Sequence, residues 1–299
     1  MLLKVFFFSS ILVATSAVRA ELKVVTTIKP LHSLIANVMD GVGEPALLIE
    51  GSTSPHSFTL KPSHAKLLEE ADIIFWVGES IETFMERPLE SIVKNAEVVE
   101  FMEVESINKL KFREESIFED HDDHDDHDDH DEHDDHDDHS GHDDHGHAHG
   151  EFDAHIWLDP MNAKEMVHEI AHELGDLDPA NKNKYEANAQ ASIRALDQLI
   201  NDIEKGINKD AKFVVFHDAY QYFEERFGVR AAGALTLNTD VLPGAKQIAD
   251  IQDVIKDRGI KCIFSEPQFN PKIITTIAED MNIKTGLFDP LGANIDSNK

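Results

Sequence analysis

The chain has 299 residues, enough to bury one large core or two cores of ordinary size. Its formal charge is −31, from 27 Lys and Arg against 58 Asp and Glu. This balance argues against nucleic acid or an anionic membrane surface as the partner, because both require clustered Lys and Arg. Its sole cysteine, Cys262, excludes a disulfide within the chain.

Residues 1–20 have the pattern of a cleaved secretory signal peptide. A basic Lys4 precedes an apolar run over 5–13, and a small-residue site at Val18-Arg19-Ala20 precedes the expected cleavage after Ala20. A short membrane anchor is the alternative, but the apolar run is too short to cross a bilayer. We predict a soluble mature protein that begins at Glu21. The periplasm is its expected location, because no cysteine follows the apolar run to accept a lipid.

Apolar runs and helical patterns alternate along the first part of the mature chain. This alternation predicts a parallel sheet covered by helices on both faces. The expected strands are 22–28, 45–50 and 72–78, and the expected helices are 30–41, 62–71 and 79–93.

Residues 120–149, called the His/Asp tract below, hold eleven of the eighteen histidines and fifteen acidic residues. The composition predicts a disordered loop over 120–150, since it has almost nothing apolar to bury. The simplest interpretation is an acidic tail that only contacts solvent. Imidazole beside carboxylate suits zinc, copper and nickel, so we predict several weak metal contacts instead. The contacts would come from His121, His124, His127, His130, His133, His136, His139, His142, His145, His147 and His149.

A connecting helix is expected after the tract. The segment HIWLDP reads as a strand opened by His155, and a helix over 161–174 follows it, capped by Asp159 with Pro160 in its first turn. A second helix is predicted over 178–207, capped by Asp178 and about 40 Å long. That length suits a rigid strut between two lobes, which would restrict motion to small tilts.

The alternation then resumes and predicts a second parallel sheet. The expected strands are 212–218, 229–235, 260–266 and 284–290, with helices over 219–227, 243–258 and 271–282. The predicted fold is therefore α/β, with a first lobe over 21–177, the connecting helix over 178–207 and a second lobe over 208–299. A cleft between the lobes, at the carboxyl ends of the strands, is where ligands of such sheets bind.

Three histidines outside the tract are predicted at strand edges or adjoining loops, where a rigid scaffold presents ligands. His56 lies in STSPHSFTL, His155 in DAHIWLDP and His217 at the end of KFVVFHD. Each one alone is more simply a satisfied polar residue. Together they form a set that suits tetrahedral zinc.

These motifs carry a resemblance. SPHSFTLKPSHAKLLEEADIIFWVG, DAHIWLDP, FHDAYQYFEERFGV, EPQF and DPLG resemble the ZnuA-type periplasmic binding proteins of zinc-uptake ABC transporters over nearly all of the mature chain. The resemblance implies that His56, His155 and His217 bind zinc, with Asp289 or water as fourth ligand. It also implies a histidine-rich loop just before DAHIWLDP. In related manganese binders a glutamate replaces the residue that matches His217, so histidine favours zinc.

One departure from the family concerns the second lobe. Family members commonly continue past DPLG through a closing helix to a cysteine that pairs with the one matching Cys262, whereas this sequence ends at Lys299. We therefore expect a fragment or a naturally short form, with a truncated second lobe.

A competing motif occurs at 168–178, HEIAHELGDLD, which has the spacing of some zinc metalloproteases. On a helix His168 and His172 would point away from the apolar stripe that contains Ile170 and Leu174, and so toward solvent. A protease is therefore disfavoured. His32 and His64 are expected to cap, pack or face water.

The sequence thus predicts a non-enzymatic zinc receptor that delivers Zn²⁺ to a membrane permease, with the ATPase on another chain, because no phosphate-binding GxxxxGK[ST] motif occurs. It is expected to be monomeric. A stand-alone periplasmic metal buffer or adhesin-like protein is the second hypothesis, and the metalloprotease is the third.

Overall fold

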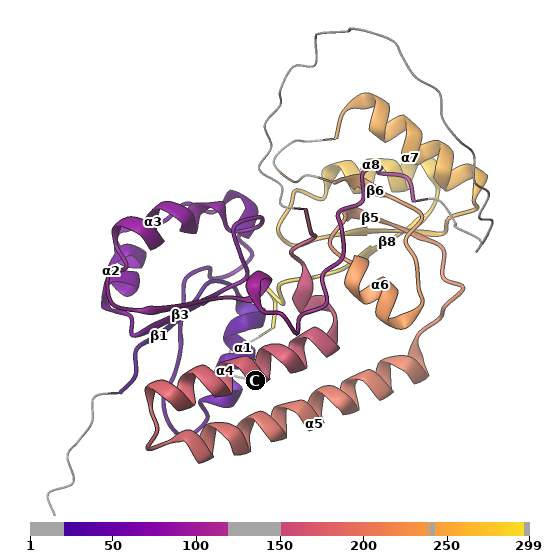
Figure 1. The fold of residues 1–299 in the computed structure, drawn as a ribbon. Coiled ribbons are helices and arrows are strands. Elements are labelled where there is room, and N and C mark those ends of the chain that lie inside the picture. The colour runs from indigo at the N-terminus through magenta and orange to yellow at the C-terminus, as the bar shows by residue number, and fades with distance from the viewer. Residues whose placement is uncertain (1–20, 119–150, 238, 240–242, 296–299) are drawn as a thin grey trace, which may run out of the picture.

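Two four-stranded parallel sheets form the core of the molecule in a computed structural model (Figure 1). The structure describes residues 21–118, 151–237, 239 and 243–295. The strand orders are β2-β1-β3-β4 in the first lobe and β6-β5-β7-β8 in the second. This arrangement confirms the predicted α/β fold with two helix-covered sheets.

The first lobe is built around two fully buried strands, β1 and β3, which pair in parallel with Val25 opposite Ile74. Its strands are β1 (Val24–Thr26), β2 (Ala46–Leu47), β3 (Ile73–Trp76) and β4 (Glu97–Glu100). Its helices are α1 (Lys29–Val38), α2 (Pro62–Glu70) and α3 (Glu86–Ser91), with 3₁₀ turns η1 (Pro55–Ser57), η2 (Thr83–Met85) and η3 (Phe101–Glu103).

The second lobe repeats the design around β5, which is also fully buried. Its strands are β5 (Phe213–His217), β6 (Ala234–Thr236), β7 (Cys262–Ser265) and β8 (Lys284–Leu287), and its helices are α6 (Gln221–Phe227), α7 (Ala245–Asp257) and α8 (Lys272–Met281). Cys262 is a free thiol, partly buried in β7.

Two long helices and a 3₁₀ turn lie between the two sheets in the chain. These are η4 (Ile156–Leu158), α4 (Pro160–Leu177) and α5 (Lys182–Gly206). Helix α5 begins beside α1 and α4 of the first lobe and runs along the molecule to the second lobe (Figure 1). The predicted cap of α4 is confirmed, because the Asp159 side chain accepts a hydrogen bond from Met161 N at 2.8 Å.

Several predicted boundaries were wrong. HIWLDP is not a strand but contains the turn η4. Helix α5 begins at Lys182 and not at Asp178, because Asp178 ends α4: the N–H of Asp178 donates to Leu174 O at 2.9 Å. Only the last residues of the predicted strand 229–235 belong to β6, and most of the predicted helix 79–93 is replaced by η2 and the short α3. Strand β4 was not predicted, since two of its four residues are glutamates.

The predicted signal peptide and the His/Asp tract lie outside the described residues. Among the helices that the structure does describe, none combines the length and the apolar character needed to cross a membrane.

Candidate metal centre

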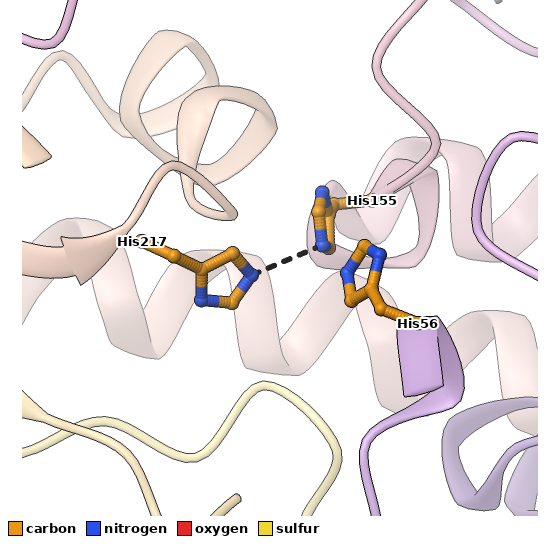
Figure 2. A group of neighbouring side chains, drawn as sticks. All are labelled: His56, His155 and His217. Carbon is orange, nitrogen blue, oxygen red and sulfur yellow. Dashed lines mark hydrogen bonds between the residues drawn. The ribbon is translucent and has the colours of Figure 1, made fainter. Parts of the chain in front are cut away.

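Three histidines from distant parts of the chain meet between the two lobes (Figure 2). His56 is carried by η1, in the loop between β2 and α2, His155 immediately precedes η4, and His217 is the last residue of β5. One ring nitrogen from each lies within 4.8 Å of the other two. Within the described part of the chain, no other group of three or more His, Cys, Asp or Glu side chains comes together in this way.

The spacing of two of these nitrogens matches the separation that a tetrahedral zinc ion requires. His155 Nε2 and His217 Nε2 are 3.3 Å apart. Two ligand nitrogens that each lie about 2.05 Å from zinc, at a tetrahedral angle, are about 3.3 Å from each other. The two buried rings are therefore already separated as a shared ion requires, and His56 offers a third nitrogen within 4.8 Å of both.

The cavity beside the rings is small. It has a volume of about 10 Å³ and is lined by the three histidines with apolar neighbours that include Trp157 and Phe269. That volume admits a single water-sized sphere. The site can therefore accept an ion but excludes an organic substrate.

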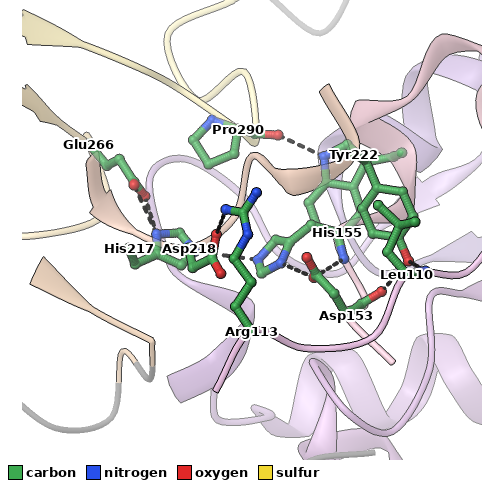
Figure 3. A network of polar contacts seen from close by, with 10 residues as sticks. Leu110, Arg113, Asp153, His155, His217, Asp218, Tyr222, Glu266 and Pro290 are labelled. Carbon is green, nitrogen blue, oxygen red and sulfur yellow. Dashed lines mark hydrogen bonds and ion pairs between the residues drawn. The ribbon is translucent and has the colours of Figure 1, made fainter. Parts of the chain in front are cut away.

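A buried carboxylate orients each of the two buried imidazoles (Figure 3). Asp153 Oδ1 accepts from His155 Nδ1 at 2.7 Å, and Glu266 accepts from His217 Nδ1 at 2.7 to 2.8 Å. A carboxylate can only accept here, so each Nδ1 carries a proton, which leaves Nε2 as the nitrogen that can offer a lone pair to an ion. The sequence analysis did not identify these two carboxylates, although DAH and SEP place acidic residues beside the right motifs.

A buried ion cluster lies behind the histidines. The guanidinium of Arg113 contacts Asp218 at 2.8 Å (Figure 3). It also contacts Glu224 at 2.7 Å. Burial outweighs the effect of the guanidinium and raises the pKa of Asp218 to about 6 and that of Glu224 to about 7. Both carboxylates therefore depend on Arg113 for their charge compensation.

The structure does not bring Asp289 into the group of three histidines. Its Oδ1 accepts from Gln268 Nε2 at 3.1 Å and its Oδ2 from Asn294 N at 3.2 Å. The assignment of Asp289 as a fourth ligand stays a prediction. The eleven histidines of the His/Asp tract lie outside the described residues, so their predicted contacts also stay predictions.

The remaining histidines lie apart from the centre. His168 and His172 are exposed on α4, as their helical positions predicted. His64 caps α2 by accepting from Lys61 N at 3.1 Å and stacks on Phe58, and His32 Nε2 lies 3.1 Å from Pro45 O. None of them joins the described three-histidine group.

Comparison with known proteins gives one family. The family model described as "Zinc-uptake complex component A periplasmic" matches residues 24–299. The "High-affinity zinc uptake system protein ZnuA" of Brucella abortus (strain 2308) is 49% identical over 282 residues, covering 91% of this chain and 84% of that protein. The protein of the same description from Yersinia pestis is 33% identical over 293 residues, covering 96% and 88%.

Solved structures show the same fold. A crystal structure of ZnuA aligns with a TM-score of 0.74 at 23% identity, covering 93% of this chain and 95% of that chain. The laminin-binding protein of Streptococcus agalactiae, described as having adhesin and metal-transporting activity, aligns with a TM-score of 0.71 at 25% identity, covering 93% of each chain. On the family match and the close relatives, this chain belongs to the ZnuA family of zinc-uptake proteins.

Proposed function

We propose that this chain is the periplasmic solute-binding component of a zinc ABC import system, which captures Zn²⁺ and delivers it to a membrane permease driven by a separate ATPase. Family membership supports this role. The observation that carries it for this chain is the convergence of His56, His155 and His217 from both lobes on one ion-sized cavity. We further propose that the protein is exported, cleaved after Ala20, monomeric and not an enzyme.

In this proposal the three histidines hold a single tight zinc ion. The fourth position is filled by water or by Asp289, whose carboxylate would have to leave Gln268 and Asn294. The N-donor set and the 3.3 Å nitrogen separation favour zinc over the hard cations Mg²⁺ and Ca²⁺, which prefer oxygen ligands.

The test is a zinc titration of the mature protein beside a His56→Ala, His155→Ala, His217→Ala triple variant. We expect the triple variant to lose one tight site and keep any weak ones. A His168→Ala, His172→Ala variant is the matched control, because both rings are exposed on α4. Tight binding that survived in the triple variant would refute the assignment, and tight binding that disappeared in the control would revive the metalloprotease hypothesis.

For the His/Asp tract we propose collection and buffering of zinc near the tight site. Deleting residues 120–149 should remove several weak sites and leave the tight one. If the deletion removed the tight site, the tract itself would be the primary binder.

An adhesin-like or buffering role without a transporter is the second candidate, favoured by the described adhesin activity of the Streptococcus agalactiae neighbour. Binding to a zinc permease separates the two hypotheses. A pull-down of the co-expressed permease should retain the zinc-loaded protein if it serves import, whereas a stand-alone buffer would not be retained.

A further inference from the structure

The segment 110–118, called the strap below, crosses from the first lobe to the second. Before the strap, Asn108 and Asn162 of α4 exchange two hydrogen bonds of 2.9 Å. At its far end Ile117 forms an antiparallel bridge with Gly233, just before β6. The strap is therefore fixed to both lobes and is a second connection beside α5.

The contact at the far end depends on close approach of two backbones. Ala234 N donates to Ser116 O at 2.8 Å. A Cβ on Gly233 would lie 2.6 Å from Ser116 O. Only glycine leaves room for the strap at this position, so the strap is seated closely against the second lobe.

Arg113 lies in the middle of the strap and binds the second lobe through its side chain. Nη1 donates to Asp218 Oδ1 at 2.8 Å and Nη2 donates to Glu224 Oε2 at 2.7 Å. The guanidinium carbon also lies 4.1 Å from the centre of the Phe118 ring. The side chains of Asp218 and Glu224 are 6% and 3% exposed, so these are buried, charge-assisted bonds of the strong kind.

One of these partners is the neighbour of a zinc ligand. Asp218 directly follows His217 at the end of β5, and Glu224 fixes α6 beside it. The first lobe, to which the strap is anchored through Asn108, carries His155 before α4. Arg113 therefore joins the lobe that carries His155 to the backbone that carries His217.

We propose that Arg113 is a positioning residue for the metal centre: through Asp218 it holds His217 within reach of His155 and His56 before the ion enters. The proposal rests on the proposed zinc-binding function. Its physical effect is preorganisation, because a site that is assembled only part of the time binds with a Kd raised by the inverse of that fraction. Loss of Arg113 should therefore weaken zinc binding without changing the ligands.

The experiment measures the zinc Kd of the full mature chain by competition with a chromophoric chelator. Arg113→Met should raise the Kd at least tenfold. The matched control is Arg226→Met. Arg226 Nε and Nη2 in α6 donate to the two carboxylate oxygens of Asp159 in the first lobe, both at 2.7 Å. Neither residue is adjacent to a proposed ligand. We expect the control to change the Kd by less than threefold.

Cobalt in place of zinc separates positioning from a change of ligands. At saturating Co²⁺ the d–d absorption of Arg113→Met should equal that of the wild type, although more cobalt is needed to reach it. An altered spectrum at saturation would overturn the proposal, because the ligand set itself would then have changed.

Arg113→Lys keeps the charge but cannot make the two-pronged contact, and it tests the proposal even if Arg113→Met does not fold. We expect a Kd between those of the wild type and Arg113→Met. Wild-type zinc affinity in folded Arg113→Lys would mean that only the charge of Arg113 matters. A loss of zinc affinity in Arg226→Met equal to that in Arg113→Met would mean that general destabilisation is the cause. Either result overturns the proposal. Failure of the wild type and Arg226→Met to bind zinc tightly would instead refute the proposed function.

Discussion

Substitution of Asp153 tests most directly whether a buried carboxylate strengthens zinc binding by the imidazole that it orients. Asp153 Oδ1 accepts from both Nδ1 and the backbone N of His155, at 2.7 and 3.0 Å, and Asp153 is 1% exposed. Asp153→Asn keeps the size of the side chain and an acceptor oxygen but removes the charge. A buried bond to a charged acceptor contributes about 1.5–3 kcal/mol against about 0.5–1.5 kcal/mol for a neutral one.

The difference of about 1–2 kcal/mol corresponds to a zinc Kd about five- to thirtyfold higher in Asp153→Asn. This agrees with the losses of about 10- to 100-fold that follow removal of residues hydrogen-bonded to metal ligands. The assay is chelator competition at pH 7.5, with circular dichroism to confirm folding.

Asp197→Asn is the control, because Asp197 is half-exposed on α5 and pairs with Lys164, far from the histidines in the chain. It should leave the Kd unchanged. The reasoning fails if folded Asp153→Asn binds zinc within twofold of the wild type, or if Asp197→Asn loses as much affinity.

Two further predictions concern stability. Burial raises the pKa of Glu82 to about 7 from 4.5, so the folded state holds a proton that the unfolded state releases between these values. The unfolding free energy of the metal-free protein should therefore fall as pH rises from 4.5 to 7. In urea titrations, Glu82→Gln should remove up to roughly 3 kcal/mol of this pH dependence. The same change of unfolding free energy with pH in the variant and the wild type would contradict the prediction. Gly233→Ala should displace the strap and destabilise the protein by about 1–3 kcal/mol in thermal unfolding. Gly206→Ala is the control and should not destabilise it, because an added Cβ there meets nothing within 4 Å. Equal melting temperatures of the two variants would contradict the prediction.

The parts of the fold that could be predicted from sequence are those with local causes. Continuous apolar runs such as FVVFH mark buried parallel strands, and an aspartate before a proline marks the start of α4. The three histidines could be found because parallel strands and their loops present side chains at one edge. Their convergence on one ion was implied by the resemblance to the ZnuA-type proteins.

Non-local contacts produced the errors. HIWLDP contains a short apolar run like that of a buried strand, but it forms the turn η4, and Trp157 donates its indole N–H to Pro290 O of the second lobe at 2.8 Å. Asp178 resembles a helix cap, yet its carboxylate accepts from Asn181 Nδ2 in the turn and from Tyr185 OH in α5. The partners of Arg113 and Glu266 lie on chain segments that meet only after folding, so these single charged residues gave no signal.

The contacts between the lobes also constrain how the ion is exchanged. A wide hinge motion would have to break the Trp157–Pro290 bond, the Tyr222 OH bond to Asp153 O at 2.6 Å, and the forks of Arg113 and Arg226. Buried bonds to charged groups cost about 1.5–3 kcal/mol each to lose, so wide opening would cost several kcal/mol before any zinc was released.

A local movement of one loop would cost less free energy than this wide opening. His56 is the least buried of the three histidines and sits on a 3₁₀ turn in a loop, whereas His155 and His217 are buried and held by carboxylates. Displacement of the His56 loop would open the cavity of about 10 Å³ without disturbing the two fixed rings. If the three histidines bind zinc as proposed, the geometry favours entry and exit of the ion on the side of His56, the least buried of the three.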